Sequence, residues 1–374
     1  MTTRILSGHV LDVLAEMRSD SVHMVWTSPP YWGLRSYDTK PQTWPDGWVG
    51  EHGLEPSLAL WLRHEVDVFR EVRRVLRPDG TLWLNCGDAY ASTVNGRPAA
   101  DVEDDDRTFR DKPISTVEGK LKPKDRIGLP HRLVFALQDD GWWWRDEIIW
   151  AKPNPMPSSV KDRTTPAHEL VFMLTKSSRY FYDAVAIQES FADERQGRDG
   201  SAQPSERDRG GRTDGFTKPN GIDPSKNGGK QKRSVWRMPA EPYPGAHFAT
   251  APTALVRPCI QAGTAREVCG RCGAPTWRVT RDRPDWSPET VGWRPGCGCG
   301  PSLMAKSLVL DPFGGAGTTA LVAEILGRDA MLIELNPEYA AMSRDRLRQA
   351  LFRVVSDLPD RSDAGLPLFG GAVA

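Results

Sequence analysis

A short segment near the N-terminus, Thr27-Ser28-Pro29-Pro30-Tyr31, carries groups that suit chemistry on the amino group of a nucleobase. The lone pair of such an amino group is delocalised into the ring, so the nitrogen is a poor nucleophile unless acceptors hold both of its N–H bonds. The Ser28 hydroxyl and a backbone carbonyl of the Pro-Pro turn are suitable acceptors, on a backbone that Pro29 and Pro30 keep rigid. Tyr31 adds an aromatic face on which a base swung out of a duplex would stack. The alternative is a plain strand end with a packed tyrosine.

A second segment, close to the C-terminus, has the pattern of a nucleoside-binding strand-turn-helix unit. Residues 307–311 predict a buried strand, which is followed by Pro312-Phe313-Gly314-Gly315-Ala316-Gly317-Thr318-Thr319 and an apolar helix. Glycines let the backbone approach a ligand closely and turn sharply into the helix. Glu334, 23 positions after Asp311 and at the end of the next apolar strand, can accept hydrogen bonds from ribose hydroxyls. An ordinary glycine turn is the alternative.

The charge of this segment indicates which nucleoside it suits. No Lys-Ser/Thr pair follows the last glycine, as it would in a phosphate-binding loop, and Asp311 precedes the glycines, unlike in the dinucleotide motif. A carboxylate there repels a pyrophosphate and attracts a cation. S-adenosylmethionine carries an ammonium and a sulfonium group, so the charge favours it over NAD.

Taken together, the two segments resemble the amino-group DNA methyltransferases of the permuted beta arrangement, in which Ser-Pro-Pro-Tyr precedes Phe-x-Gly-x-Gly. The resemblance covers most of the chain. Besides Thr27–Tyr31 it includes Gly80–Asp88, Trp150–Pro157, His168-Glu169, Trp236–Leu255, Asp311–Thr319 and Glu334–Tyr339.

The resemblance implies transfer of a methyl group from S-adenosylmethionine to an exocyclic amino group of a flipped base in double-stranded DNA. It implies that the target base is held by Ser28, Pro29, Pro30 and Tyr31. It also implies that Asp311 lies near the amino acid end of the cofactor and Glu334 on its ribose. The residues expected at the cofactor are Asp311, Pro312, Phe313, Gly315, Gly317, Thr318, Thr319, Glu334, Asn336 and His9. His9 is a departure, because the family usually has Gly-Asp where this chain has Gly8-His9, and that Asp is thought to contact adenine.

The target base follows from the first residue of the motif. A serine, as in Ser28, resembles the cytosine-N4 enzymes, whereas an aspartate resembles most adenine-N6 enzymes. We therefore favour cytosine N4, with adenine N6 as the alternative. Cytosine-C5 chemistry needs a nucleophilic cysteine, and the dipeptide Pro258-Cys259 is one candidate. It does not follow a strand beside a cofactor loop, so we interpret Cys259 as a partly buried cysteine of a helix.

Two other functions are compatible with parts of the pattern. Methylation of a protein glutamine or an RNA amino group uses a similar Pro-Pro-Tyr loop, but Ser28 replaces the usual asparagine and the motif order is permuted. A different class is a catalytically idle zinc-ribbon protein that only binds DNA. The intact motifs at 28–31 and 311–319 argue against this second possibility.

Four of the six cysteines form two close pairs, which predicts a metal site. The pairs Cys269-x-x-Cys272 and Cys297-x-Cys299 are separated by 24 residues rich in Arg, Trp and Pro. Two such pairs suit a tetrahedral zinc ribbon, and a segment with so few aliphatic residues would hardly fold without metal. We expect a closed structural Zn²⁺ site, with redox thiols or unliganded cysteines as the alternative.

Helical and strand patterns alternate through the chain and predict an α/β fold. We expect a Rossmann-like methyltransferase fold, with a mostly parallel twisted sheet, helices on both faces and a circularly permuted order. A turn is expected at Pro78-Asp79-Gly80, after a helix that Ser57 caps. The expected organisation is a catalytic half at 1–188, a variable target-recognition insertion at 189–236, a return to the core at 237–262, a zinc-ribbon-like insertion at 263–301, a cofactor-binding half at 302–352 and a flexible tail at 353–374.

Composition limits the partners. The 374 residues contain 49 Lys and Arg and 49 Asp and Glu, which excludes a globally basic DNA-coating protein. The chain has neither a signal peptide pattern nor an apolar run of about 20 residues, so we expect a cytoplasmic protein. Within 189–237, eleven Lys or Arg against eight Asp or Glu are compatible with contact to DNA. Gly365–Phe369 resembles peptides that dock on bacterial sliding clamps, although the usual glutamine is absent.

Overall fold

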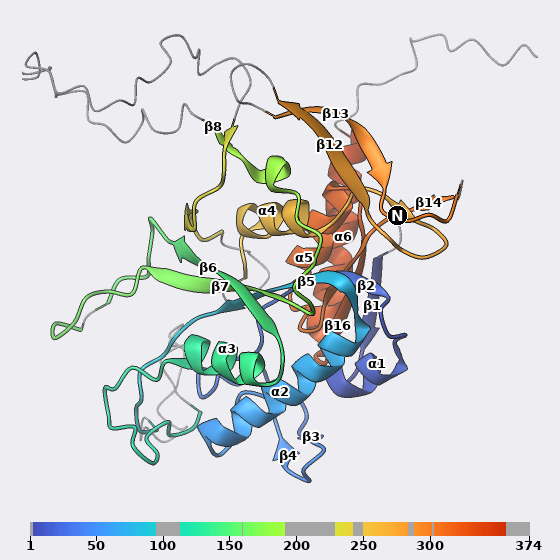
Figure 1. Cartoon of the computed structure of the whole chain (residues 1–374). Helices are drawn as coiled ribbons and strands as arrows, with labels where there is room; N and C mark the ends of the chain where they lie inside the picture. The colour runs from blue at the N-terminus through green and yellow to red at the C-terminus, as the bar shows by residue number, and fades with distance from the viewer. Residues whose placement is uncertain are drawn as a thin grey trace, which may run out of the picture.

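An eight-stranded sheet forms the centre of the computed structural model, which describes residues 3–94, 113–158, 160–190, 229–241, 250–282, 288–300 and 303–356 (Figure 1). In spatial order, its strands are β1 (Thr3–Ser7), β16 (Asp329–Glu334), β15 (Leu308–Asp311), β2 (Val22–Thr27), β5 (Leu76–Cys86), β7 (His168–Thr175), β6 (Trp143–Ala151) and β10 (Val235–Arg237). The five strands from β1 to β5 are mutually parallel. β7 runs antiparallel to both of its neighbours, and β10 is parallel to β6.

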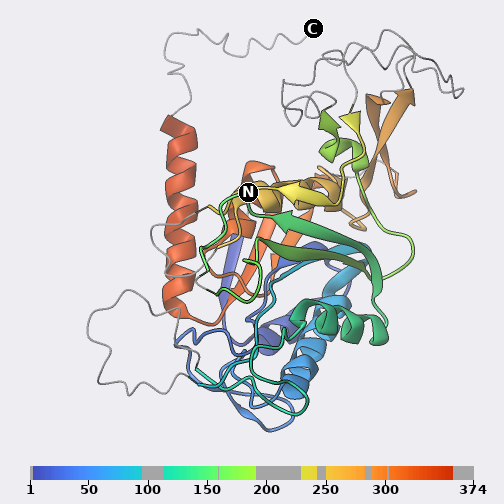
Figure 2. The same ribbon diagram turned by 90° about the vertical axis from the view of Figure 1, so that its left-hand side faces the viewer.

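Helices cover both faces of this sheet, as Figures 1 and 2 show. One face packs against α1 (Val10–Glu16), α2 (Leu58–Val75) and α3 (Leu129–Asp139), and the other against α4 (Thr253–Gly263), α5 (Thr318–Ile325) and α6 (Pro337–Ser356). Each face has its own apolar core. The Rossmann-like, mostly parallel architecture expected from the sequence is therefore confirmed.

The permuted order places a topological switch point between β15 and β2. From β2 the chain passes through α2 to β5 on one side, and from β15 it passes through α5 to β16 on the other. Ligands of open α/β sheets bind outside the carboxyl ends of the strands at such a point. The end of β15 and the end of β2 carry the two motifs, Asp311–Thr319 and Thr27–Tyr31.

The helix that leads to β5 begins and ends as the sequence predicts. The Ser57 hydroxyl accepts a hydrogen bond from the Leu60 N–H at 3.2 Å, and the helix ends at Val75 because Leu76 is already extended. The turn expected at Pro78–Gly80 is instead an irregularity inside β5. Pairing with β2 passes from Leu76 directly to Thr81, which leaves the intervening residues outside the regular ladder.

Smaller elements surround the sheet. They are β3 (Gln42–Thr43) with β4 (Val49–Gly50), β8 (Glu189–Ser190) with β9 (Gly229–Lys230), β11 (Val268–Cys269) with β14 (Met304–Ala305), β12 (Thr276–Asp282) with β13 (Pro288–Pro295), and the 3-10 helix η3 (Ala184–Ile187). Most of the expected recognition insertion, residues 191–228, lies outside the described residues, as does the tail segment 365–369. The last two residues of that insertion belong to β10 and so to the main sheet. None of the described helices is long and apolar enough to cross a membrane.

Gly263, the last residue of α4, sets how closely that helix approaches the sheet. A Cβ atom there would lie 2.7 Å from Thr81 Oγ1 and 2.9 Å from Trp83 Nε1, two atoms that are hydrogen-bonded to each other in the core. We expect Gly263→Ala to lower the free energy of unfolding by about 1–3 kcal/mol because the strand cannot retreat. Thermal unfolding measures it. Gly292→Ala in β13 is the control, since a Cβ at Gly292 meets nothing within 4 Å; equal melting temperatures for the two variants would contradict this packing.

Candidate active site

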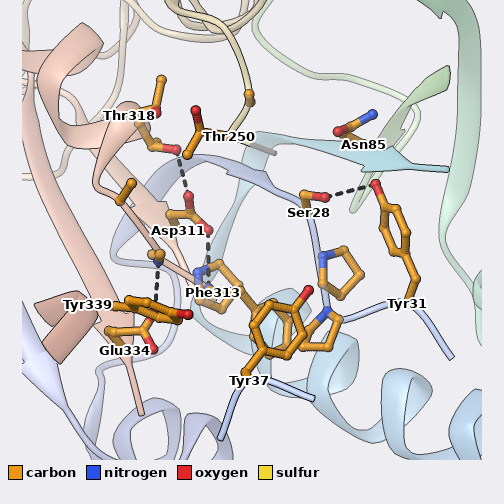
Figure 3. Close-up of a pocket in the computed structure, with 18 of the residues that line it drawn as sticks. Ser28, Tyr31, Tyr37, Asn85, Thr250, Asp311, Phe313, Thr318, Glu334 and Tyr339 are labelled. Atoms are coloured by element: carbon orange, nitrogen blue, oxygen red, sulfur yellow. Dashed lines mark hydrogen bonds between the residues drawn. The ribbon is translucent and has the colours of Figure 1, made fainter. Parts of the chain in front are cut away.

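A cavity of about 650 Å³ lies at the carboxyl ends of the central strands and joins the two motifs (Figure 3). All four residues of the Ser-Pro-Pro-Tyr motif, Ser28, Pro29, Pro30 and Tyr31, lie on its wall. Eight of the ten residues expected at the cofactor line it too: His9, Asp311, Pro312, Phe313, Gly315, Thr318, Thr319 and Glu334. Gly317 and Asn336 are not on the wall. The cavity is thus shared by segments almost 300 positions apart in the sequence.

Asp311 ends β15 at the centre of this cavity and is fixed by three donors. Its Oδ1 accepts from the Thr27 hydroxyl at 2.8 Å and from the Phe313 N–H at 3.1 Å, and its Oδ2 accepts from the Thr319 hydroxyl at 2.6 Å. Burial raises the pKa of Asp311 to about 7, since these hydrogen bonds compensate only in part for lost hydration and Glu334 adds repulsion. A cation placed beside it would lower that pKa.

Glu334 ends β16 and orients the glycine turn. Its two oxygens accept from the Gly315 N–H at 2.7 Å and the Asn336 N–H at 2.8 Å, and burial raises its pKa. Gly317 does not line the cavity but allows the turn to form. It has φ of +76°, and a Cβ on it would lie 3.0 Å from Ser343. Asn336 likewise acts indirectly, because its side chain donates to the Tyr37 carbonyl at 3.2 Å.

His9 marks an aromatic end of the cavity. Burial lowers the pKa of His9, so its imidazole is neutral at pH 7, and its Nε2 is buried without a partner among the described residues. Trp44 lies edge-on to His9 at 4.9 Å, and His52 contacts Phe313 at 5.4 Å between ring centroids. These rings suit a flat heterocycle, and the unpartnered nitrogen offers it a hydrogen bond.

The Ser-Pro-Pro-Tyr loop is held rigidly against α2. The Ser28 hydroxyl lies 3.0 Å from the Tyr31 hydroxyl, and the Trp61 indole N–H donates to the Pro30 carbonyl at 3.1 Å. Burial, followed by the nearby Glu169 and Cys86, raises the pKa of Tyr31 well above its ordinary value, so its hydroxyl stays protonated. Gly87 allows the ring to lie there, because a Cβ on Gly87 would come within 2.9 Å of it.

Three polar residues without an expected role, Asn85, Lys152 and Glu169, complete this end of the cavity. Glu169 accepts from Lys152 on one oxygen and from the Asn85 amide at 3.3 Å on the other. The Lys152 ammonium also lies 4.2 Å from the Trp150 ring centroid. Asn85, Lys152 and Glu169 all fall within the segments that carry the family resemblance, and this was the available signal. For Tyr37, Trp44 and His52, which wrap around the other end, no periodic pattern pointed to the cavity.

The cysteines lie elsewhere. The sulfur atoms of Cys269, Cys272, Cys297 and Cys299 are all within 4.8 Å of one another, in a region that does not line the cavity. Cys259 is fully buried in α4, where its thiol donates to the Leu255 carbonyl, and burial raises its pKa. It is therefore no nucleophile for cytosine-C5 chemistry.

S-adenosylmethionine fits the groups that this cavity presents. Two acids, the buried Asp311 and the half-buried Glu334, lie beside the glycine turn, which suits a molecule with cationic and hydroxyl groups. The neutral His9, with its unpartnered nitrogen between aromatic rings, suits the adenine. Residues 312–319 contain no lysine or arginine, and Arg346, which reaches this turn from α6, donates to the Ala316 carbonyl and the Thr318 hydroxyl.

Comparison with known proteins agrees with this geometry. The sequence profile of a family described as DNA methylase matches residues 22–345. The Type II methyltransferase M.Cfr9I of Citrobacter freundii is 40% identical over 344 residues, which cover 92% of this chain and 87% of the relative. M.XycI of Xanthomonas campestris pv. cyanopsidis is 39% identical, with 92% and 87% covered, and M.SmaI of Serratia marcescens is 37% identical, with 92% and 90% covered.

Among solved structures, the PvuII DNA methyltransferase (cytosine-N4-specific) has the same fold. The TM-score is 0.54 at 17% identity, and the match covers 95% of this chain and 93% of that one. Because the family profile spans most of the chain and relatives near 40% identity span nine-tenths of it, the chain belongs to the N6/N4 DNA methylase family and is an S-adenosylmethionine-dependent DNA methyltransferase.

Proposed function

We propose that the chain methylates the N4 amino group of cytosine in double-stranded DNA, acting in the cytoplasm. The observation that carries the proposal is the single cavity in which the Ser28 loop and the Asp311 turn face the same space. Adenine N6 is the second candidate, because the same cavity chemistry serves any exocyclic amino group.

The residues of the serine loop would hold the reacting nitrogen. Ser28 Oγ is one acceptor for the two N–H groups of the amine. The Pro30 carbonyl is already engaged by Trp61, so we assign the second acceptor to the Pro29 carbonyl. Held in this way, the amino nitrogen loses conjugation with the ring and its lone pair turns toward the cofactor side. S-adenosylmethionine supplies the electrophilic methyl group when bound. Tyr31, whose hydroxyl contacts Ser28, fixes the direction of that acceptor and offers its ring to the base.

The choice of cytosine rests on the serine of the motif and on the donors beside it. Asn85 and Lys152 are both tied to Glu169 on the wall next to Tyr31. Cytosine presents two adjacent acceptors, N3 and O2, beside its amino group. The Asn85 amide already donates to Glu169 and to the Leu170 carbonyl, so we assign these acceptors to the Lys152 ammonium, which keeps N–H groups beyond the one given to Glu169. Adenine would offer that ammonium only N1, because a C–H group stands where cytosine has O2.

Asp311, Glu334 and His9 would bind the cofactor. The cationic methionine end is assigned to Asp311, whose burial is costly until a positive charge arrives. The ribose is assigned to Glu334 and the adenine to the His9 end, between Phe313 and Trp44. Thr318 and Thr319 are the first two residues of α5 and lie on the cavity wall. Sequence recognition is assigned to the insertion at 189–236, whose central part lies outside the described residues.

The product identifies the base. Duplex phage DNA incubated with the chain and S-adenosylmethionine, then digested to nucleosides and analysed by mass spectrometry, is expected to contain N4-methylcytosine. N6-methyladenine instead would overturn the base assignment while leaving the family intact. Ser28→Ala is the control for contaminating activity, and at equal enzyme concentration and incubation time its initial rate should be lower by about a hundredfold or more.

Substitutions in the two halves of the cavity should change different quantities, kcat for the Ser28 loop and the cofactor Kd for the Asp311 turn. Ser28→Ala removes an acceptor for the amine and is expected to lower kcat by about 10²–10³-fold, with a cofactor Kd within about twofold of the unmodified chain. Asp311→Asn removes the negative charge and should raise the cofactor Kd about tenfold or more. Isothermal titration and single-turnover assays measure these quantities. Equal loss of cofactor affinity in both variants would contradict the assignment.

The raised pKa of Asp311 makes stability depend on pH. In the cofactor-free chain the folded pKa is about 7 and the unfolded value is near 3.8, so between these values the folded state binds more protons. The free energy of unfolding should therefore fall as pH rises toward 7, by an amount on the order of a few kcal/mol. The Asp311→Asn side chain cannot titrate. The melting temperature of this variant minus that of the unmodified chain should therefore increase from pH 5 to pH 8. A pH-independent difference between the two would show that Asp311 titrates normally.

A further inference from the structure

We propose that Cys269, Cys272, Cys297 and Cys299 bind one Zn²⁺ ion at the opposite end of the sheet from the active site. The four sulfur atoms lie within 4.8 Å of one another, and the structure records no disulfide among the six cysteines, all of which are described. A tetrahedral zinc with Zn–S bonds near 2.3 Å places its sulfurs about 3.8 Å apart, so small side-chain shifts close the site. Four thiolates fill every position of the metal, which makes the site structural and leaves no place for a catalytic water.

The backbone around the first cysteine pair is shaped for such a site. The Gly273 N–H donates to the Cys269 carbonyl at 2.7 Å, and Gly273 has φ of +71°, which turns the chain back after Cys272. Gly270 lies against Leu303, the residue before β14: a Cβ on Gly270 would come within 2.3 Å of the Leu303 carbonyl oxygen. Cys269 and Cys272 therefore lie on a tight turn. The second pair, Cys297 and Cys299, follows the C-terminal end of β13.

The described part of the segment between α4 and β15 has too small an apolar core to fold without metal. Among its described residues, the buried hydrophobic cluster contains only Ala265 and Val268, together with Phe181 of the main domain and a partly buried Trp277. Segments of about 40 residues with so little buried apolar surface depend on metals or disulfides for their order. Zinc binding would supply this stability.

Polar contacts join the cysteine site to the amino ends of the central strands. Arg77, near the start of β5, donates to the Cys272 carbonyl at 2.9 Å, and His23, near the start of β2, lies 3.1 Å from the Gly273 carbonyl. Arg77 is held in this contact by a two-point ion pair with Asp79, at 2.8 and 3.1 Å. Ser28 and Asn85 lie at the other ends of the same two strands. The metal is therefore separated from the cavity by the length of the sheet.

The position of the site indicates what the metal holds in place. The hairpin of β12 and β13 leaves from between the two cysteine pairs and projects beside η3 and β8 (Figure 1). Arg278 in this hairpin forms an ion pair with Asp183 at 2.7 Å and lies 4.5 Å from the Trp293 ring centroid. With zinc at its base, the hairpin is fixed next to β8, the strand with which the recognition insertion begins.

The test is the metal content and the metal spectrum of the full chain. Protein purified under reducing conditions without chelator should contain one zinc per chain by plasma mass spectrometry. The zinc content of the double variant Cys272→Ser/Cys299→Ser should be lower by about tenfold or more. The control is Cys259→Ala, which replaces a buried cysteine outside the cluster and should retain one zinc per chain.

A second measurement on the unmodified chain guards against misfolding of the variant. Replacement of zinc by Co²⁺ should produce the intense visible bands of a tetrahedral thiolate site, and removal of the metal should speed proteolysis within 264–307. Substoichiometric zinc in the unmodified chain, or a weak octahedral Co²⁺ spectrum, would overturn the proposal. Because zinc content is measured without methylation, this result is independent of the proposed base specificity.

Discussion

One buried carboxylate ties the two halves of the active site together. Asp311 accepts a hydrogen bond from Thr27, the residue directly before the serine loop, and another from Thr319, at the start of the helix after the glycine turn. The same side chain thus fixes the loop that would hold the base relative to the turn that would hold the cofactor. Its burial raises its pKa to about 7, so the site is poised for a positive charge. Pre-organisation of this kind moves the cost of orienting the reactants from the reaction to folding.

The active-site cavity and the cysteine turn lie at opposite ends of the strands of the central sheet. Parallel strands bring their carboxyl ends to one edge, where β2, β15 and β16 deliver Ser28, Asp311 and Glu334 to a shared cavity. Their amino ends meet at the opposite edge, where Arg77 and His23 contact the cysteine turn. An insertion at that edge can vary without disturbing the reacting groups. This explains how a chain of the methylase family accommodates a segment whose described residues bury so little apolar surface.

The sequence predicted the fold and the two motifs because their signals are local. Ser57 caps its helix, and glycines at 314, 315 and 317 mark a turn that few other residues can make. The environment of each group was not predictable, because it depends on distant segments. Glu169 becomes part of the cavity only when β7 lies antiparallel between β5 and β6, and Tyr37 only when Asn336 holds its carbonyl. The turn expected at 78–80 is at the predicted place, but it is an irregularity inside β5. The reason is that β2 pairs with Leu76 before these residues and with Thr81 after them.

Titration of the Asp311 carboxyl carbon by NMR, with and without S-adenosylmethionine, shows whether this carboxylate organises the site. We expect a pKa near 7 in the free chain and a marked fall of that pKa when the cation is bound, since the ligand's charge replaces the hydration lost on burial. An ordinary carboxyl pKa in the free chain, unchanged by the ligand, would contradict the central role assigned to Asp311.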